Sequence, residues 1–177
     1  MNLPNRLSII RVLCIPAIVI LLYQPSDACR IIAGVLFILA SVTDFLDGFI
    51  ARKYHLITDF GKFIDPVADK LLVLTTLIML LHRGLTEAWI IVIILSRELA
   101  VDGLRMVAVT KGKVIAASKF GKYKTTCQMV MITVSVLLNA AAFSSWYMIV
   151  LTVAAVVLTL LSAVDYFVKN RDVFASA

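Results

Sequence analysis

Four aspartates fall into two pairs with helical spacing, and they are the residues of this sequence best suited to chemistry. Asp44 and Asp47 are three residues apart, and Asp65 and Asp69 are four residues apart. In an α-helix, these spacings place the two members of each pair on one face. If the two helices pack antiparallel, the four carboxylates meet at a similar depth, where their mutual repulsion requires cations. Carboxylate oxygens are ligands that suit Mg²⁺ or Mn²⁺, and a pair of such ions could clamp a phosphoryl group during its transfer.

Small residues and an arginine accompany these aspartates. Gly48 and Ala51 lie on or beside the face of the first pair, so they leave room for a bulky ligand, and Gly61 permits a close approach to the backbone. Arg52 is placed to contact a phosphate through two hydrogen bonds. The alternative is that the aspartates form structural ion pairs with nearby arginine and lysine side chains. Four aspartates in register with three small residues favour the ligand site.

Together these residues resemble the signature of the CDP-alcohol phosphotransferase family. The matching positions read Asp44-x2-Asp47-Gly48-x2-Ala51-Arg52-x8-Gly61-x3-Asp65-x3-Asp69. Members of that family are six-helix membrane enzymes, usually homodimers, that use an alcohol to displace CMP from a CDP-linked lipid. The resemblance implies that the four aspartates bind two metal ions and that Asp69 is also the base that activates the acceptor hydroxyl. It further implies that the other signature residues border the CDP group, namely Gly48, Ala51, Arg52 and Gly61.

The N-terminal segment narrows the choice of substrate. Residues 2–8, Asn-Leu-Pro-Asn-Arg-Leu-Ser, together with Arg11, resemble the opening of the phosphatidylglycerophosphate synthase branch of this family. That branch often carries threonine in place of Ser8, so the hydroxyl is kept. Asn5 and Ser8 are expected either to cap the first helix or to donate hydrogen bonds to the phosphates of CDP.

Basic residues in the second half of the chain indicate a second anionic substrate. Arg97 and Arg105 are eight residues apart and therefore close in azimuth on one helix. Three lysines follow, at Lys119, Lys122 and Lys124. Cations beside a metal-diphosphate site favour glycerol 3-phosphate over neutral glycerol, and this pattern also resembles the same branch, in which the equivalent residues bind the acceptor phosphate. The structural alternatives are ion pairs of the two arginines with Glu98 or Asp102, and a cytoplasmic loop that is simply rich in lysine.

The composition is that of an integral membrane protein. Hydrophobic residues make up 62% of the 177 residues and charged residues 16%, against about 45–50% and about 25% in soluble domains. We expect one all-α membrane domain over residues 1–177 with six helices that cross a hydrocarbon core of about 30 Å. The predicted spans are residues 7–23, 30–54, 61–82, 86–109, 123–143 and 145–168.

The distribution of basic residues predicts the orientation. Of 17 Lys and Arg, only Arg30 and Arg83 fall in the three proposed outer connections. Both termini are then on the cytoplasmic side of the inner membrane, and the net charge of +6 belongs to cytoplasmic loops rather than to a nucleic-acid site. The second, third and fourth helices each have one charged half on that side. Ionisable groups at membrane depth normally face a wet cavity or the interior of a bundle. We therefore expect a polar cavity that opens to the cytoplasm and holds the active site.

These features predict a transferase that joins a phosphatidyl group from CDP-diacylglycerol to sn-glycerol 3-phosphate and releases CMP. One alternative is the same chemistry with inositol phosphate or serine as the acceptor. A second is a membrane prenyltransferase, although such enzymes typically have two aspartate-rich motifs and more spans. A third is a carrier of divalent cations, which should avoid the arginines and lysines that surround this site.

Overall fold

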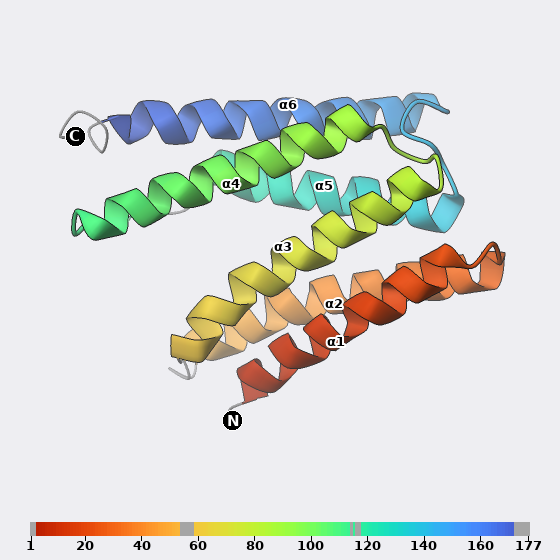
Figure 1. The fold of residues 1–177 in the computed structure, drawn as a ribbon, viewed down its shortest axis with the longest axis horizontal. Coiled ribbons are helices and arrows are strands. Elements are labelled where there is room, and N and C mark those ends of the chain that lie inside the picture. Colours follow the sequence, from red (N-terminus) through yellow and green to blue (C-terminus); the bar gives the residue numbers. More distant parts are fainter. Residues whose placement is uncertain (1–2, 54–58, 114, 116–117, 172–177) are drawn as a thin grey trace. The chain divides into compact units, whose positions relative to one another are not determined.

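The described part of the chain contains six α-helices and no strand (Figure 1). The computed structural model describes residues 3–53, 59–113, 115 and 118–171, without the side chains of residues 3–6, 45–53, 59–63 and 119. The prediction of an all-α protein with six helices is confirmed. In chain order the helices are α1 (Leu3–Tyr23), α2 (Asp27–Lys53), α3 (Asp59–His82), α4 (Ala88–Thr110), α5 (Lys119–Leu138) and α6 (Trp146–Lys169).

The fifth helix ends earlier than its hydrophobic sequence predicts. The predicted span continued to residue 143, whereas α5 ends at Leu138. Asn139 has a left-handed backbone conformation with φ 52°, and the N–H of Ala140 donates to the carbonyl of Ser135 at 3.1 Å. A left-handed residue followed by a reverse hydrogen bond is a common way for a helix to stop. Here the backbone conformation terminates the helix, although the sequence remains apolar.

The chain forms two compact units. The first contains residues 1–85 and 132–140, and the second contains residues 86–131 and 141–177. In the first unit, α1 packs against both α2 and α3. The apolar side chains that form its core include Ile18, Leu22, Phe37, Leu72 and Leu77.

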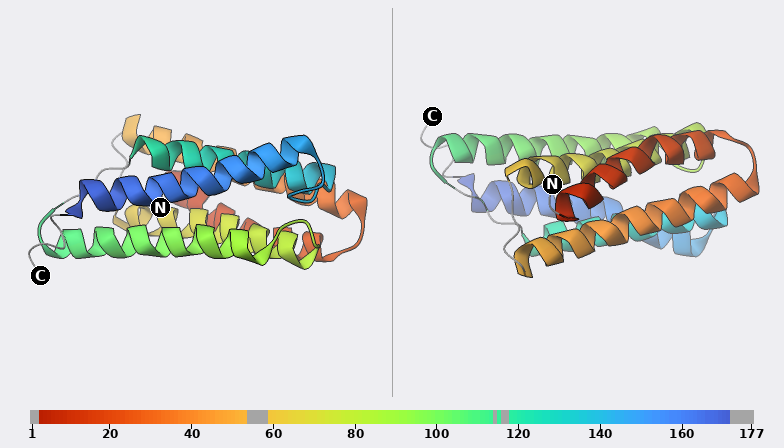
Figure 2. Two further views of the ribbon diagram at one scale, coloured as in Figure 1. Left: turned by 90° about the horizontal axis from the view of Figure 1, so that it is seen from above. Right: turned by 90° about the horizontal axis from the view of Figure 1, so that it is seen from below.

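In the second unit, α4 and α6 run side by side (Figure 2). Val101, Leu104 and Ala108 of α4 bury their side chains against Tyr166 of α6. The backbone then leaves α4 through Gly112, whose φ of 69° is in the region that glycine adopts without strain. This unit therefore holds the charged half of α4 close to one buried face of α6.

Arg30 binds the end of α5 inside the first unit. Its side chain is buried, and Nη1 donates to the carbonyl of Val136 at 2.6 Å and to the carbonyl of Leu137. The other guanidinium nitrogens bond Oδ1 of Asp27, at 3.2 Å from Nε and 3.0 Å from Nη2. The last carbonyls of a helix have no partner within the helix and carry partial negative charge. Arg30 supplies that partner from α2.

Arg83 does the same for the end of α1. Its Nη1 donates to the carbonyls of Leu22 at 3.0 Å and Gln24 at 3.1 Å. The neighbouring ring of His82 stacks on Tyr23 with 5.1 Å between the centroids. Both basic residues that the charge pattern assigned to the outer connections therefore bind helix carbonyls.

One helix of the described residues, α6, is long enough and apolar enough to cross a membrane on length and composition alone. Residues 7–23 of α1 form a shorter apolar helix. Three of the other helices, α2, α3 and α4, contain uncharged stretches of 13, 12 and 9 residues next to charged halves. The number of spans and the cytoplasmic cavity stay predictions.

We expect Arg30→Ala to lower the free energy of unfolding by about 2–3 kcal/mol, because one buried and one partly buried carbonyl lose a charged hydrogen-bond donor. Denaturant unfolding of the detergent-solubilised protein measures this change. The matched control is Asp27→Asn, which alters the exposed partner of the same arginine and should cost less than about 1 kcal/mol. Equal effects of the two substitutions would show that the end of α5 does not depend on Arg30.

Candidate functional site

Arg11 joins an aspartate of α2 to an aspartate of α3 in the first unit. Its Nη1 lies 2.8 Å from Oδ1 of Asp44 and 3.3 Å from Oδ1 of Asp69. The side chain of Arg11 is fully buried, and its Nε donates to the carbonyl of Ala40 at 3.3 Å. The predicted approach of the two aspartate-bearing helices is thus seen for this pair, because both carboxylates converge on one nitrogen. The aspartates are partly exposed, 26% for Asp44 and 35% for Asp69, so a ligand can still reach them.

Ser8 contacts the third described aspartate of the signature. Its hydroxyl donates to Oδ1 of Asp65 at 2.5 Å, and Ser8 is buried. Ser8 and Arg11 are one turn apart on α1, so one face of this helix contacts all three aspartates. The expectation that Ser8 or Asn5 caps the first helix is wrong, because α1 begins at Leu3 and both residues lie inside it. A serine has one O–H, and while Ser8 donates it to Asp65 it cannot donate it to a CDP phosphate.

Several predicted site residues have side chains outside the described part of the structure. Their backbone lies in the helices already given, in α1, α2, α3 or α5. They are Asn5, Asp47, Gly48, Ala51, Arg52, Gly61 and Lys119. Among the residues whose side chains are described, no group of three or more His, Cys, Asp or Glu side chains is arranged to hold a metal ion. The two-metal centre stays a prediction.

The described aspartates nevertheless suit such an ion. All their donor atoms are carboxylate oxygens, which match the preference of Mg²⁺ and Mn²⁺. The oxygens of Asp44 and Asp69 already share one cationic group, the guanidinium of Arg11. The residues present therefore fit a divalent cation in the donor chemistry that they offer.

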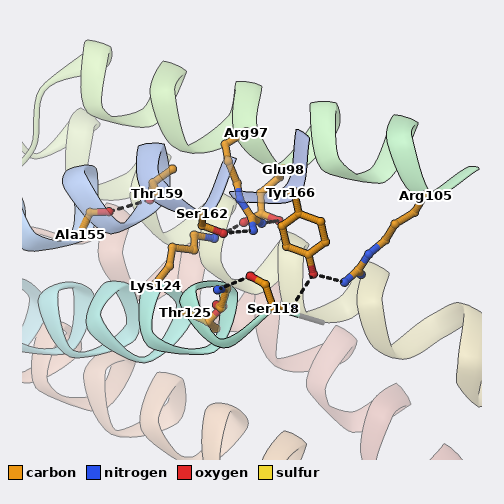
Figure 3. A network of polar contacts seen from close by, with 11 residues as sticks. Arg97, Glu98, Arg105, Ser118, Lys124, Thr125, Ala155, Thr159, Ser162 and Tyr166 are labelled. Carbon is orange, nitrogen blue, oxygen red and sulfur yellow. Dashed lines mark hydrogen bonds and ion pairs between the residues drawn. The ribbon is translucent and has the colours of Figure 1, made fainter. Parts of the chain in front are cut away.

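Three of the basic residues that were predicted to bind an acceptor phosphate gather in the second unit, Arg97, Arg105 and Lys124 (Figure 3). Arg97 donates from Nη2 to Oγ of Ser162 at 2.5 Å, and its Nη1 lies 3.4 Å from Oε2 of Glu98. The other oxygen of Glu98 pairs with Nζ of Lys124, which is buried. One carboxylate therefore serves two cations. The expected structural pairing of Arg97 with Glu98 is present, but at a long distance.

Arg105 has a different environment. Its Nη2 donates to the hydroxyl of Tyr166 at 2.6 Å. Among the described residues no carboxylate lies within ion-pair distance of Arg105, so the alternative pairing with Asp102 is not seen. Lys122 is exposed on α5. The structure thus brings Arg97 and Lys124 to one carboxylate and leaves Arg105 beside a neutral hydroxyl.

Two hydroxyl-bearing residues of α6 in this cluster were missed by the sequence analysis. Ser162 and Tyr166 lie one turn apart on α6 and are buried together with Thr152 and Thr159. These polar residues follow spacings of seven, three and four, which place them on one face of a helix. That periodicity was the available signal. It lies mostly within residues 125–164, which carry no charge, and such a stretch is also typical of helices that face lipid or pack in a bundle.

The family profile that matches this chain and the names of its relatives indicate the same enzyme family. The sequence profile of the CDP-alcohol phosphatidyltransferase family matches residues 1–164. A Bacillus subtilis (strain 168) protein named CDP-diacylglycerol–glycerol-3-phosphate 3-phosphatidyltransferase is 40% identical, over 97% of this chain and 96% of its own length. A Rickettsia bellii protein of the same name is 41% identical over 98% and 97%. A Mycobacterium tuberculosis (strain H37Rv) protein named probable phosphatidylglycerophosphate synthase is 39% identical over 97% and 83%.

Replacing Arg11 with methionine should destabilise the first unit. Two carboxylates would keep their charge without the cation that they share, and we expect a loss of about 2–4 kcal/mol in the free energy of unfolding. The measurement is denaturant unfolding in the presence of a chelator, so that no divalent ion replaces the guanidinium. Arg11→Lys, which keeps the charge, should lose less. Native stability of Arg11→Met would mean that the carboxylates do not need this arginine.

Proposed function

The chain belongs to the CDP-alcohol phosphatidyltransferase family, and from this we propose that it transfers a phosphatidyl group from CDP-diacylglycerol to sn-glycerol 3-phosphate. The products are phosphatidylglycerophosphate and CMP. The proposal depends above all on one observation: relatives named for this reaction are about 40% identical to the chain over nearly its whole length. Both the family and the acceptor agree with the sequence-based expectation.

The proposed metal site consists of the four signature aspartates, Asp44, Asp47, Asp65 and Asp69. With Mg²⁺ or Mn²⁺ bound, this site would neutralise the diphosphate of CDP-diacylglycerol and stabilise the CMP that leaves. The support is the oxygen-only donor set and the meeting of Asp44 and Asp69 at one cation. Ser8 fixes the orientation of Asp65 through its hydrogen bond, and Arg11 fixes the other two described carboxylates.

Asp69 is the proposed general base. Its carboxylate is the more exposed of the two that Arg11 contacts, and it lies one turn beyond Asp65 towards the apolar half of α3. An acceptor hydroxyl held beside it can give up its proton to the carboxylate as the hydroxyl oxygen attacks the phosphatidyl phosphorus. The new P–O bond forms, the bond from that phosphorus to CMP breaks, and CMP departs with the electron pair.

The proposed subsites divide the remaining residues between the two substrates. For the CDP group they are Asn5, Gly48, Ala51, Arg52 and Gly61, together with Ser8, which would act through the carboxylate of Asp65 rather than by donating to a phosphate. For the phosphate of the acceptor they are Arg97, Arg105, Lys119, Lys122 and Lys124. The support for the second set is electrostatic, because Arg97 shares its carboxylate with Lys124 and Arg105 contacts a neutral hydroxyl. A multi-pass arrangement in the inner membrane, with both termini and the site on the cytoplasmic side, and a homodimer complete the proposal.

The decisive test is release of CMP from CDP-diacylglycerol in mixed micelles, with a panel of acceptors. We expect activity with glycerol 3-phosphate, little with glycerol, serine or inositol phosphate, and loss of activity in EDTA that excess Mg²⁺ or Mn²⁺ reverses. Activity with serine or inositol phosphate and none with glycerol 3-phosphate would reject the proposed acceptor. Full activity in EDTA would reject the metal site.

Asp69→Asn should separate the base from the other metal ligands. We expect CDP-diacylglycerol to bind with nearly native affinity, while the single-turnover rate at saturating Mg²⁺ falls by about 10²–10⁴, the usual contribution of a positioned base. Asp27→Asn, an exposed aspartate at the start of α2, is the control and should leave both quantities unchanged. If lipid binding is lost and extra metal restores the rate, Asp69 is only a ligand.

A further inference from the structure

Tyr166 is at the centre of the basic cluster, yet the proposed reaction gives it no role. Its side chain is buried on α6. Its hydroxyl oxygen accepts hydrogen bonds from Nη2 of Arg105 at 2.6 Å and from the backbone N–H of Ser118 at 3.1 Å (Figure 3). Because both partners are donors, the tyrosine oxygen anchors the end of the Arg105 side chain to the segment that precedes α5.

The ring of the same tyrosine contacts both arginines. The central guanidinium carbon lies 5.4 Å from the ring centroid for Arg97 and 5.3 Å for Arg105. Distances within about 6 Å allow a favourable cation–π interaction, which is stronger when water is excluded. One turn earlier on α6, Ser162 accepts the hydrogen bond from Arg97 at 2.5 Å. Two neighbouring positions of α6 therefore orient both guanidinium groups.

Both arginines retain unused hydrogen-bonding capacity. Nε of Arg97 and Nε of Arg105 are buried, and neither has a hydrogen-bond partner among the described residues. A buried donor of a charged group that lacks a partner is unfavourable. An oxyanion with several acceptor oxygens, such as a phosphate monoester, is the kind of ligand that arginine pairs bind best.

We propose that Tyr166 and Ser162 are positioning residues that hold Arg97 and Arg105 in the orientation that binds the phosphate of the acceptor. This inference rests on the proposed function, since it concerns how that acceptor is recognised. Arginine loses considerable side-chain freedom when it is fixed in one orientation. Fixing both side chains before the ligand arrives reduces the entropy lost on binding and so favours tighter binding. The competing explanation is that Tyr166 only fills the core between α4 and α6, where it packs against Val101, Leu104 and Ala108.

Tyr166→Phe separates these explanations, because it keeps the ring, its burial and its contacts with the guanidinium groups and removes only the hydroxyl. We expect KM for glycerol 3-phosphate to rise by roughly tenfold, as for loss of a hydrogen bond to a charged group. KM for CDP-diacylglycerol and kcat at saturating glycerol 3-phosphate should stay within about twofold of native. The matched control is Thr159→Val on the same buried face of α6, where the lost hydroxyl bonds the helix's own carbonyl of Ala155 at 2.6 Å. It should change neither KM.

A double-mutant cycle tests whether the tyrosine acts through Arg105. Arg105→Ala removes the whole contribution of Arg105 to acceptor binding. When Tyr166→Phe is added to Arg105→Ala, KM for glycerol 3-phosphate should rise by less than about twofold over that of Arg105→Ala alone. Ser162→Ala should raise the same KM through Arg97, and it carries the test if Tyr166→Phe does not yield folded protein. Thermal unfolding of each variant checks the fold.

The outcomes distinguish the two proposals. Native protein that releases no CMP with glycerol 3-phosphate rejects the proposed function and this inference with it. Native protein that is active with this acceptor, together with a Tyr166→Phe variant whose KM matches that of Thr159→Val, rejects the positioning role alone. Equal rises in KM for both substrates would also reject it, because the hydroxyl would then support the fold in general.

Discussion

Carboxylates on α2 and α3 cannot approach one another unless a cation lies between them, and Arg11 supplies that cation from α1. A guanidinium group stays charged at any ordinary pH, so its burial is unfavourable unless it is paired and hydrogen-bonded. Asp44, Asp69 and the carbonyl of Ala40 meet that requirement together. The packing of three helices thus depends on electrostatic pairing as well as on the apolar side chains of the core.

The two units differ in the kind of charge that each brings together. In the first, two partly exposed carboxylates share one arginine, which suits a site that attracts cations. In the second, Arg105 bonds a tyrosine hydroxyl, and Arg97 bonds a serine hydroxyl and lies 3.4 Å from a glutamate that also pairs with Lys124. This second arrangement suits an anion. A transferase that must neutralise a diphosphate and also hold a phosphorylated alcohol needs sites of both kinds.

The sequence predicted the elements better than the contacts between them. Hydrophobic lengths predicted six helices, and helical spacing predicted that aspartates of two helices would meet. The end of α5 was misplaced, because Asn139 stops the helix by its backbone conformation while the surrounding residues remain apolar. Ser8 was expected at a helix end or on a ligand. Its contact with Asp65 was not predicted, because the two residues are 57 positions apart in the chain. The role of Tyr166 was missed for the same reason, since it depends on how α6 packs against α4.

The use that the structure makes of Arg30 and Arg83 changes how the charge bias of this chain should be counted. Both guanidinium groups bind carbonyl oxygens at the ends of other helices, where they compensate the negative ends of the helix dipoles. A charge used in this way contributes to folding, so its presence in an outer connection has a structural reason that is separate from orientation. If the two arginines that bind helix carbonyls are not counted, the proposed outer connections are close to neutral. Removing either arginine would then be expected to impair folding while the preference of the chain for one orientation is kept.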